Sequence, residues 1–274
     1  MPVTTSEKAM RFKALHEAPG AFVIANVWDA GSARIVEGLG FQALATSSGA
    51  SAGVLGRRDG NVSRDEALAQ ASAIVMATQL PVSADLEKGF GDTSEDVAET
   101  IRLAAEVGLV GGSIEDATGD KQRPFYDLNH AAERVAAAVE AARSVPFPFT
   151  LTARTENYLW GNPDLRDTIQ RLQAFERAGA DVLFAPGLPD LPSVEAVCAA
   201  LSKPVNFMAG IKGQSFSVAE LEAVGVKRIS LAGSLYRAAM TGLIEAASEV
   251  NEKGTFSYLD RAAITSQLNK LMRN

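Results

Sequence analysis

The chain has 274 residues and a formal net charge of −7, and 47% of its residues are hydrophobic, so it is long enough to bury a sizeable core. The acidic balance and the lack of any dense Lys/Arg run argue against a nucleic acid or an anionic membrane as a partner. The single cysteine, Cys198, excludes an intramolecular disulfide framework, and no apolar run approaches the roughly 20 residues that cross a bilayer.

Short apolar runs alternate with amphipathic helical stretches along the chain. The predicted strands cover residues 22–27, 43–47, 82–85, 112–115, 149–154, 181–185, 205–208 and 228–231. The predicted helices between them include residues 64–79, 94–107, 131–143, 165–178, 194–201 and 217–224. Residues 1–7 lack the positively charged and apolar segments of a secretory signal, so we expect a cytoplasmic protein.

Strands separated by helices indicate βα units and a parallel sheet. Eight such units within about 250 residues favour a closed (β/α)8 barrel, the TIM barrel, over an open doubly wound sheet, which is the alternative. No low-complexity segment or long linker interrupts the pattern, so residues 1–274 are predicted to form a single domain.

The chain continues beyond the eighth unit as a helical extension, at about residues 234–274. Within it, residues 257–272 form a predicted helix with an apolar stripe that consists of Leu259, Ile264, Leu268 and Leu271. Such a stripe must be buried on this subunit or on a neighbour, and we favour a contact between subunits.

Two carboxylates, Asp85 and Glu87, lie at and just beyond the end of the third strand. Side chains two residues apart on a strand face the same side, so these two can converge on one point. The fourth strand ends in Glu115 and Asp116. Carboxylates without Cys or His at the ends of successive strands form the oxygen-rich setting that a hard divalent cation prefers. The alternative is that each pair caps the helix that follows.

Other polar residues concentrate at the carboxyl ends of the strands, which is where a (β/α)8 barrel carries its active site. They are Asn26 on the first strand, Ser48, Gly49 and Ala50 after the second, Arg154 on the fifth and Asn206 on the seventh. Helix caps and turns do not require an arginine opposite several acids. We therefore predict that this rim is a functional site.

These motifs together resemble the isocitrate lyase/phosphoenolpyruvate mutase superfamily. The matching segments are NVWDAGSAR at residues 26–34, Ser48-Gly49, Asp85-x-Glu87-x-Gly89-Phe90-Gly91, Ile114-Glu115-Asp116 and Ala153-Arg154-Thr155. The resemblance implies a Mg2+-dependent (β/α)8 barrel that passes through an enolate of pyruvate or of a related 2-oxo acid. It also implies a homo-oligomer, a tetramer or a dimer, in which the eighth helix is exchanged between subunits, and this exchange would account for the C-terminal extension.

The resemblance assigns a metal role to four acids. Asp85 matches the direct ligand of Mg2+, for which Mn2+ is a possible substitute, whereas Glu87 and Glu115 match positions that act through bound water. Asp59 lies near the position of another acid of the outer shell.

The substrate side of the site follows from the same resemblance. Backbone N–H groups of Ser48, Gly49 and Ala50 match the cradle for the substrate carboxylate, and Asn206 is a further candidate for substrate binding. Arg154 matches the arginine that clamps substrate oxygens, a task suited to its planar fork. The predicted catalytic residues are Arg154, Glu115 and Lys121, the last of which would move in when its loop closes.

The loop after the fourth strand departs from the family pattern. The carbon–carbon lyases carry a K-x-C-G-H motif there, whose Cys serves as general acid, whereas residues 117–125 contain neither Cys nor His. Cys198 is expected to be a core residue, and His16 and His130 are expected to be surface or capping residues. The motifs therefore identify the metal and the enolate, but not the bond that breaks.

We predict a Mg2+-dependent lyase that cleaves a C–C bond of a small 2-oxo or 2-hydroxy di- or tricarboxylic acid, by decarboxylation or by retro-aldol cleavage. Decarboxylation needs chiefly an electron sink, so the missing Cys shifts weight towards it. One alternative is P–C bond chemistry, with Lys121 and Arg123 holding a phosphonate. Others are a Schiff-base aldolase that uses Lys88 or Lys212, and a keto-acid-binding barrel without catalysis.

Overall fold

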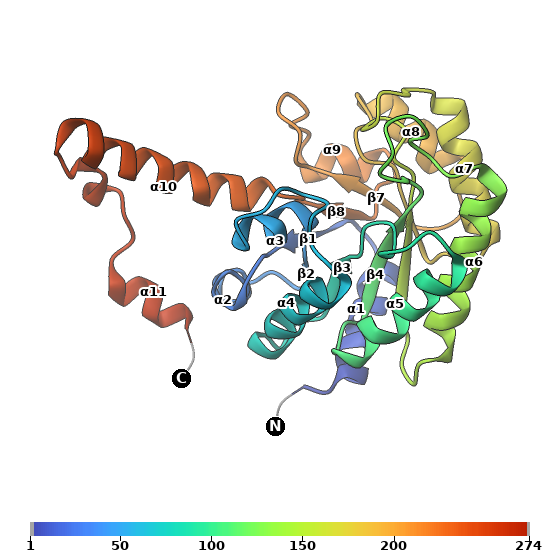
Figure 1. The fold of residues 1–274 in the computed structure, drawn as a ribbon, viewed down its shortest axis with the longest axis horizontal. Helices are drawn as coiled ribbons and strands as arrows, with labels where there is room; N and C mark the ends of the chain where they lie inside the picture. The colour runs from blue at the N-terminus through green and yellow to red at the C-terminus, as the bar shows by residue number, and fades with distance from the viewer. Residues whose placement is uncertain (1–2, 273–274) are drawn as a thin grey trace.

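The strands form a closed parallel barrel in the computed structural model, which describes residues 3–272 (Figure 1). Each strand pairs with the next along the chain, and β8 returns to pair with β1. The strands are β1 (Phe22–Asn26), β2 (Leu44–Ala45), β3 (Val82–Asp85), β4 (Gly111–Glu115), β5 (Thr150–Arg154), β6 (Val182–Phe184), β7 (Val205–Met208) and β8 (Arg228–Ser230). The prediction of a (β/α)8 barrel is confirmed, and the open sheet is excluded.

Helices surround the barrel and follow the strands in turn. They are α1 (Thr5–Glu17), α2 (Ala30–Gly38), α3 (Ser48–Val54), α4 (Arg64–Ala77), α5 (Ser94–Glu106), α6 (Leu128–Ser144), α7 (Leu165–Arg177), α8 (Leu191–Ala199), α9 (Val218–Ala223) and α10 (Ser234–Lys253). Several begin with a reciprocal capping box, such as Thr93 with Asp96 at α5, which satisfies N–H groups that have no partner inside the helix. Among the described residues, no helix is both long enough and apolar enough to span a membrane.

The two faces of the barrel strands have different chemistry. Side chains that point outwards, such as Leu44, Ile114 and Ile229, are fully apolar and pack beneath the helices in one buried cluster. Side chains two residues apart share a face, so the intervening residues point inwards. Many of these are small or polar, as with Ser83 and Ser113, whereas bulky branched residues usually fill such a barrel. The barrel interior therefore contains open space.

Residues 234–272 leave the barrel as a C-terminal arm (Figure 1). Helix α10 extends away from the strands, and the chain then returns through a 3-10 turn, η1 (Ser257–Asp260), and a short helix, α11 (Thr265–Leu271). The prediction of one helix over residues 257–272 is wrong, because residues 261–264 separate these two pieces. Leu271 lies against Gly38 of α2, where a Cβ would meet its Cδ2 at 2.5 Å.

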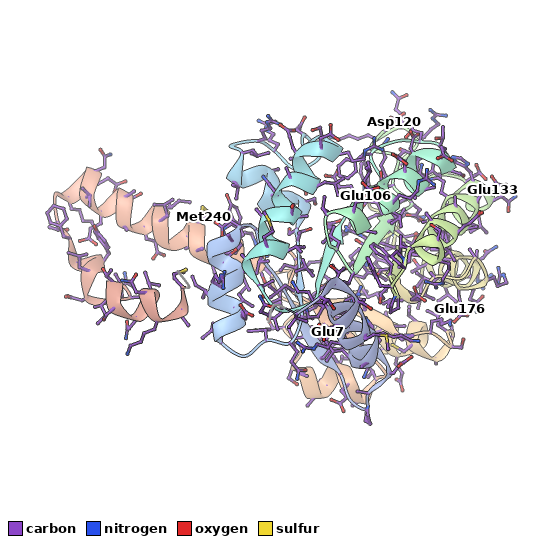
Figure 2. The ribbon with its side chains drawn as sticks, turned by 90° about the horizontal axis from the view of Figure 1, so that it is seen from below. Glu7, Glu106, Asp120, Glu133, Glu176 and Met240 are labelled. Carbon is purple, nitrogen blue, oxygen red and sulfur yellow. The ribbon has the colours of Figure 1, made fainter. Side chains whose placement is uncertain are left out.

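Most apolar side chains of the arm are exposed, and neither α10 nor α11 contains a buried residue. Figure 2 shows the side chains of the arm standing clear of the barrel on several sides. The large exposed apolar residues of the arm are Leu243, Ile244, Val250, Phe256, Leu259, Ile264, Leu268 and Met272.

Candidate active site

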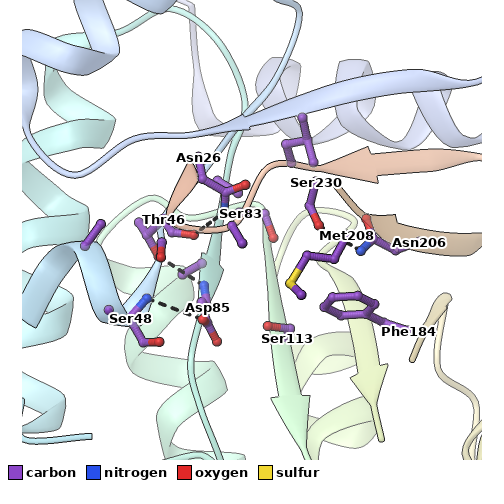
Figure 3. A pocket seen from close by; sticks show the side chains of 18 of the residues that line it. Asn26, Thr46, Ser48, Ser83, Asp85, Ser113, Phe184, Asn206, Met208 and Ser230 are labelled. Carbon is purple, nitrogen blue, oxygen red and sulfur yellow. Dashed lines mark hydrogen bonds between the residues drawn. The ribbon is translucent and has the colours of Figure 1, made fainter. Parts of the chain in front are cut away.

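A cavity of about 420 Å³ opens among the carboxyl ends of the strands. Figure 3 shows polar side chains from several strands around it, among them Asp85, Ser113 and Asn206. The cavity extends from the first turn of α3 and the start of α10 at the rim down to Arg228 inside the barrel. Its lining combines carboxylates, hydroxyls and guanidinium groups with a few apolar side chains, such as Phe184 and Met208.

Arg154 lies at the centre of a group of acids. Its Nη1 atom is 3.5 Å from Asp85 Oδ1 and 3.6 Å from Glu115 Oε2, and its Nε donates to Glu156 Oε1. Burial disfavours the charge on Arg154, but Glu156, Glu115 and Asp85 together hold its pKa above the usual value. The structure thus brings the predicted arginine together with two of the predicted acids and adds Glu156, which was not among the predicted site residues.

Backbone groups fix the carboxylate of Asp85. Its Oδ2 accepts a hydrogen bond from Ser48 N–H, and its Oδ1 accepts one from Glu87 N–H, each at 3.3 Å. Ser48, Gly49 and Ala50 form the first turn of α3, so helical geometry leaves their N–H groups without partners inside the helix. Ser48 N–H is used by Asp85, whereas Gly49 and Ala50 line the cavity at the positive end of the helix.

The acids outnumber the cations in this part of the site. Burial, with Asp85 and Asp59 nearby, raises the pKa of Glu87 to about 7. Burial also raises the pKa of Glu115 well above its ordinary value, although Arg154 opposes the shift. The backbone of Glu87 adopts a left-handed conformation with φ of 50°, which a non-glycine residue rarely adopts and which is typical of strained functional loops. One arginine therefore does not neutralise the cluster.

This donor set fits a hard divalent cation. It consists of carboxylate oxygens alone, and a bound cation would relieve the repulsion between them. Among residues 3–272, no group of three or more His, Cys, Asp or Glu side chains is arranged as a cage that could hold a metal ion. Mg2+ needs no such cage, because it keeps several waters and takes only one or two carboxylates from the protein. Two backbone N–H groups hold the carboxylate of Asp85, and the carboxylates of Glu87 and Glu115 lie near it.

The remaining predicted residues occupy different places. Asp59 comes to the rim of the cavity, where a Cβ on Gly49 would lie 3.1 Å from its Oδ2. Asn206 lines the cavity and is buried, with hydrogen bonds to Ser230 and Arg228. Lys121 is exposed on the loop between β4 and α6 and is not among the residues that line the cavity.

Asp116 and the other lysines lie outside the cavity lining. Asp116 is buried and accepts hydrogen bonds from Thr155 Oγ1, Glu156 N–H and Arg171, so it anchors the loop that follows β4. Lys88 Nζ bonds to Asp92 and to the carbonyl of Thr118. Lys212 is exposed, so neither lysine is placed to form a Schiff base in the cavity.

The histidines are also placed away from the cavity lining. His16 lies partly buried in the last turn of α1, where its ring packs edge to face on Phe12 and Phe22. Its Nδ1 contacts the carbonyl of Phe12, four residues earlier in α1. His130 lies in the first turn of α6 and contacts the backbone carbonyl of Asp92. The described residues that line the cavity include no Cys, His or Lys.

Known proteins show the same fold and related sequences. A family model described as phosphoenolpyruvate phosphomutase matches residues 12–251. A candidate lyase/mutase of Burkholderia cenocepacia J2315 is 52% identical, and its crystal structure matches with a TM-score of 0.95 over 97% of this chain and 96% of that one. A candidate phosphonomutase of the same strain is 37% identical, with a TM-score of 0.83 over 89% and 99% of the two chains. An oxaloacetate decarboxylase of Chromohalobacter salexigens is 29% identical over 265 residues, which cover 90% of each chain. The chain therefore belongs to the phosphoenolpyruvate phosphomutase family, within the superfamily that also contains isocitrate lyase, and is an enzyme of the lyase/mutase type.

Proposed function

We propose that the protein is a Mg2+-dependent lyase that cleaves a C–C bond of a 2-oxo di- or tricarboxylic acid, by decarboxylation, through a pyruvate-like enolate. One observation carries the proposal. Asp85 and Arg154 line the cavity, Glu115 contacts Arg154 from outside the lining, and no described residue of the lining is Cys, His or Lys. Retro-aldol cleavage needs a base and an acid at the reacting atoms, whereas decarboxylation needs chiefly an electron sink.

The chain's own groups can bind and orient such a substrate. Gly49 and Ala50 line the cavity in the first turn of α3, where N–H groups without a partner inside the helix would suit a carboxylate, and Arg154 can hold the carbonyl side of the substrate with its planar fork. Asp85 would hold Mg2+ directly and Glu87 and Glu115 through water, and the cation would supply stabilisation of the negative charge that develops on the carbonyl oxygen. When the C–C bond breaks, CO2 leaves and the electron pair moves to the carbonyl. A proton must then reach the carbon that lost CO2.

The relatives support this reading at the level of reaction class. The Chromohalobacter relative is an oxaloacetate decarboxylase, and the 52% identical structure is described as a candidate lyase/mutase. P–C bond chemistry is the second candidate, because the 37% identical structure is described as a candidate phosphonomutase. Both reactions develop an enolate at the same place, so the cluster around Arg154 suits either.

A substrate screen distinguishes these reactions. The protein with Mg2+ is incubated with oxaloacetate, methylisocitrate, isocitrate, phosphonopyruvate or malate derivatives and assayed for pyruvate and glyoxylate. We expect pyruvate from a 2-oxo dicarboxylate, at a rate that exceeds spontaneous decarboxylation with Mg2+ alone. Turnover of phosphonopyruvate alone would establish the second candidate instead.

The metal role of Asp85 is tested separately by calorimetry with oxalate, a dianion that resembles an enolate. We predict that oxalate binds the wild-type protein only when Mg2+ is present, and that Asp85→Ala abolishes this binding while the fold persists. Asp65→Ala, which removes an exposed acid from the first turn of α4, is the matched control and should bind oxalate normally. Oxalate binding that survives both a chelator and Asp85→Ala would refute the metal site.

A further inference from the structure

The floor of the cavity carries a buried cation that the proposed chemistry does not use. Arg228 begins β8, is 5% exposed and lines the cavity. It lies two residues before Ser230 on the same strand face, which places it about 7 Å deeper in the barrel. The acids around Arg154 belong to the rim, so the floor and the rim form two separate charged regions of one cavity.

Only neutral groups meet the guanidinium of Arg228. Its Nε donates to Asn206 Oδ1 at 2.8 Å, and its Nη2 donates to Thr152 Oγ1 at 2.9 Å. Its Nη1 is 3.5 Å from His16 Nε2, and burial together with Arg228 lowers the pKa of His16 to about 3, so that ring is neutral. Among residues 3–272 Arg228 forms no ion pair, and burial lowers its pKa to about 9, which still leaves it charged at neutral pH.

A buried charge without a counter-charge is costly, and fixed neutral acceptors only partly replace its lost hydration. Three partners nevertheless hold this guanidinium in place, from β7, β5 and α1. The guanidinium also retains N–H donors beyond these three contacts, since arginine has five. A preorganised cation at the bottom of an accessible cavity is suited to an anion that enters from the rim.

The wall between rim and floor suits a polar ligand. Ser83, Ser113, Asn206 and Ser230 line it, as Figure 3 shows. Asn206 connects the wall to the floor, because its Nδ2 donates to Ser230 Oγ while its Oδ1 accepts from Arg228. An entirely apolar tail would leave these groups and the guanidinium without partners once water is displaced.

We propose that Arg228 forms an anion subsite at the floor of the barrel, which takes the distal carboxylate of a substrate whose 2-oxo acid end is bound at the rim. The substrate class is thereby narrowed to 2-oxo acids that carry a carboxylate at the far end of the chain in addition to the carboxylate that leaves as CO2 from the carbon next to the carbonyl. Asn206 and Thr152 act as positioning residues for the guanidinium. The inference rests on the proposed function for the placement of the 2-oxo acid end.

The test compares pairs of 2-oxo acids that differ only in the tail, by calorimetry with Mg2+. The pairs are 2-oxoglutarate with 2-oxopentanoate, 2-oxoadipate with 2-oxohexanoate, and 2-oxopimelate with 2-oxoheptanoate. We expect the wild-type protein to bind the acid-tailed member of at least one pair about tenfold more tightly or better. In Arg228→Met this preference should disappear, while the affinity for oxalate, which occupies only the rim, stays at the wild-type value.

Arg237→Met is the matched control, since Arg237 lines the same cavity at the rim and bonds to the carbonyl of Gly210. The proposal is overturned if the wild-type protein shows no preference in any pair, if Arg228→Met keeps the preference, or if Arg237→Met removes it instead. If Arg228→Met does not fold, the proposal is tested with the wild-type protein and Arg228→Lys. The lysine variant is expected to keep part of the preference for the acid-tailed ligands. If the wild-type protein does not bind oxalate in the presence of Mg2+, the result would instead count against the rim site and the proposed function.

Discussion

Arg154 is the residue on which the candidate site depends most. It contacts Asp85, Glu115 and Glu156 at once, and a single ammonium group cannot reproduce this fork. We predict that Arg154→Lys lowers kcat/KM by about 100-fold or more on the substrate found in the screen, because oriented donors at the developing charge are lost. Steady-state kinetics measure this, with thermal unfolding to show that the barrel is intact. Near-normal turnover by Arg154→Lys would show that the fork of Arg154 is not needed to hold the substrate.

His16 makes the stability of the fold depend on pH. Its pKa is lowered to about 3 by burial and by Arg228, whereas the same side chain titrates near 6.5 in the unfolded chain. The unfolded state therefore binds a proton below about pH 6.5 that the folded state does not, so the stabilising contribution is present at pH 7 and is lost as the pH falls.

We predict that the free energy of unfolding drops by about 2 kcal/mol more between pH 7 and pH 5 in the wild-type protein than in His16→Gln. Urea titrations at each pH measure the two slopes. Between pH 7 and pH 8 the two proteins should show the same slope, since the imidazole is then neutral in both states. Equal slopes between pH 7 and pH 5 would mean that His16 is protonated in the folded state.

At the residue scale, the sequence predicted those site residues whose positions follow from strand ends and local spacing. Asp85 and Arg154 were identified because each ends a strand, and parallel strands bring their carboxyl ends to one rim. Arg228 was missed, because a charge at the start of a short strand looks like an exposed end. Only the barrel register, in which Arg228 pairs with Phe22 and Asn206, shows that it points inwards.

Lys121 was predicted as a catalytic residue, but the structure does not place it in the cavity lining. A motif assigns it a role, but the conformation of the loop between β4 and α6 decides whether it reaches the cavity. In the structure Asp116, Thr155 and Arg171 hold the base of that loop, and Lys121 stays exposed. No local pattern encodes such contacts, since the partners are 39 and 55 residues away in the chain.

At the element scale, β4 has little room for a side chain at Gly111. A Cβ on Gly111 would lie 2.8 Å from the carbonyl oxygen of Thr150 and 2.9 Å from the ring of Phe12 in α1. The backbone contact cannot give way without moving β5. We predict that Gly111→Ala lowers the free energy of unfolding by about 1–3 kcal/mol, as overpacking generally does.

Chemical denaturation measures this loss against a second glycine. Gly31 in α2 has no neighbour closer than 3.5 Å to its Cβ position, and helical Ala is favoured over Gly. Gly31→Ala should therefore leave stability unchanged or raise it by up to about 1 kcal/mol. If Gly111→Ala also leaves the free energy of unfolding unchanged or raises it, β4 can accommodate a methyl group at this position despite the close contacts.

The elements themselves were largely predictable from the sequence. The strand at Val82–Asp85 has the bounds that its pattern predicts, because buried strands read as short apolar runs. Strand β2 pairs over Leu44–Ala45 alone, since its neighbours Thr46 and Ser47 lead directly into α3. The break between η1 and α11 was missed because apolar spacing continues through it.

At the scale of the whole molecule, eight βα units determined the fold class, and the closed barrel followed from their number. The arm is different, because most of its apolar side chains are exposed and neither α10 nor α11 contains a buried residue. Apart from contacts such as Leu271 with Gly38, its apolar side chains have little of this chain to cover them. Since α10 also delivers Tyr236 and Arg237 to the rim, the packing of the arm bears on the shape of the cavity.

We predict that the arm packs on a second copy of this chain, giving a dimer or a tetramer in solution. Leu243 and Ile244 on α10 are 61% and 64% exposed, which is unusual for adjacent large apolar residues on a helix. Light scattering at micromolar concentration should give the mass of an oligomer for the wild-type protein and that of a monomer for Leu243→Asp/Ile244→Asp, because charges are costly in an apolar interface. Glu252→Gln, an exposed polar change on the same helix, should stay oligomeric. A wild-type monomer would rule the interface out, and an oligomeric double variant would place the subunit contact elsewhere.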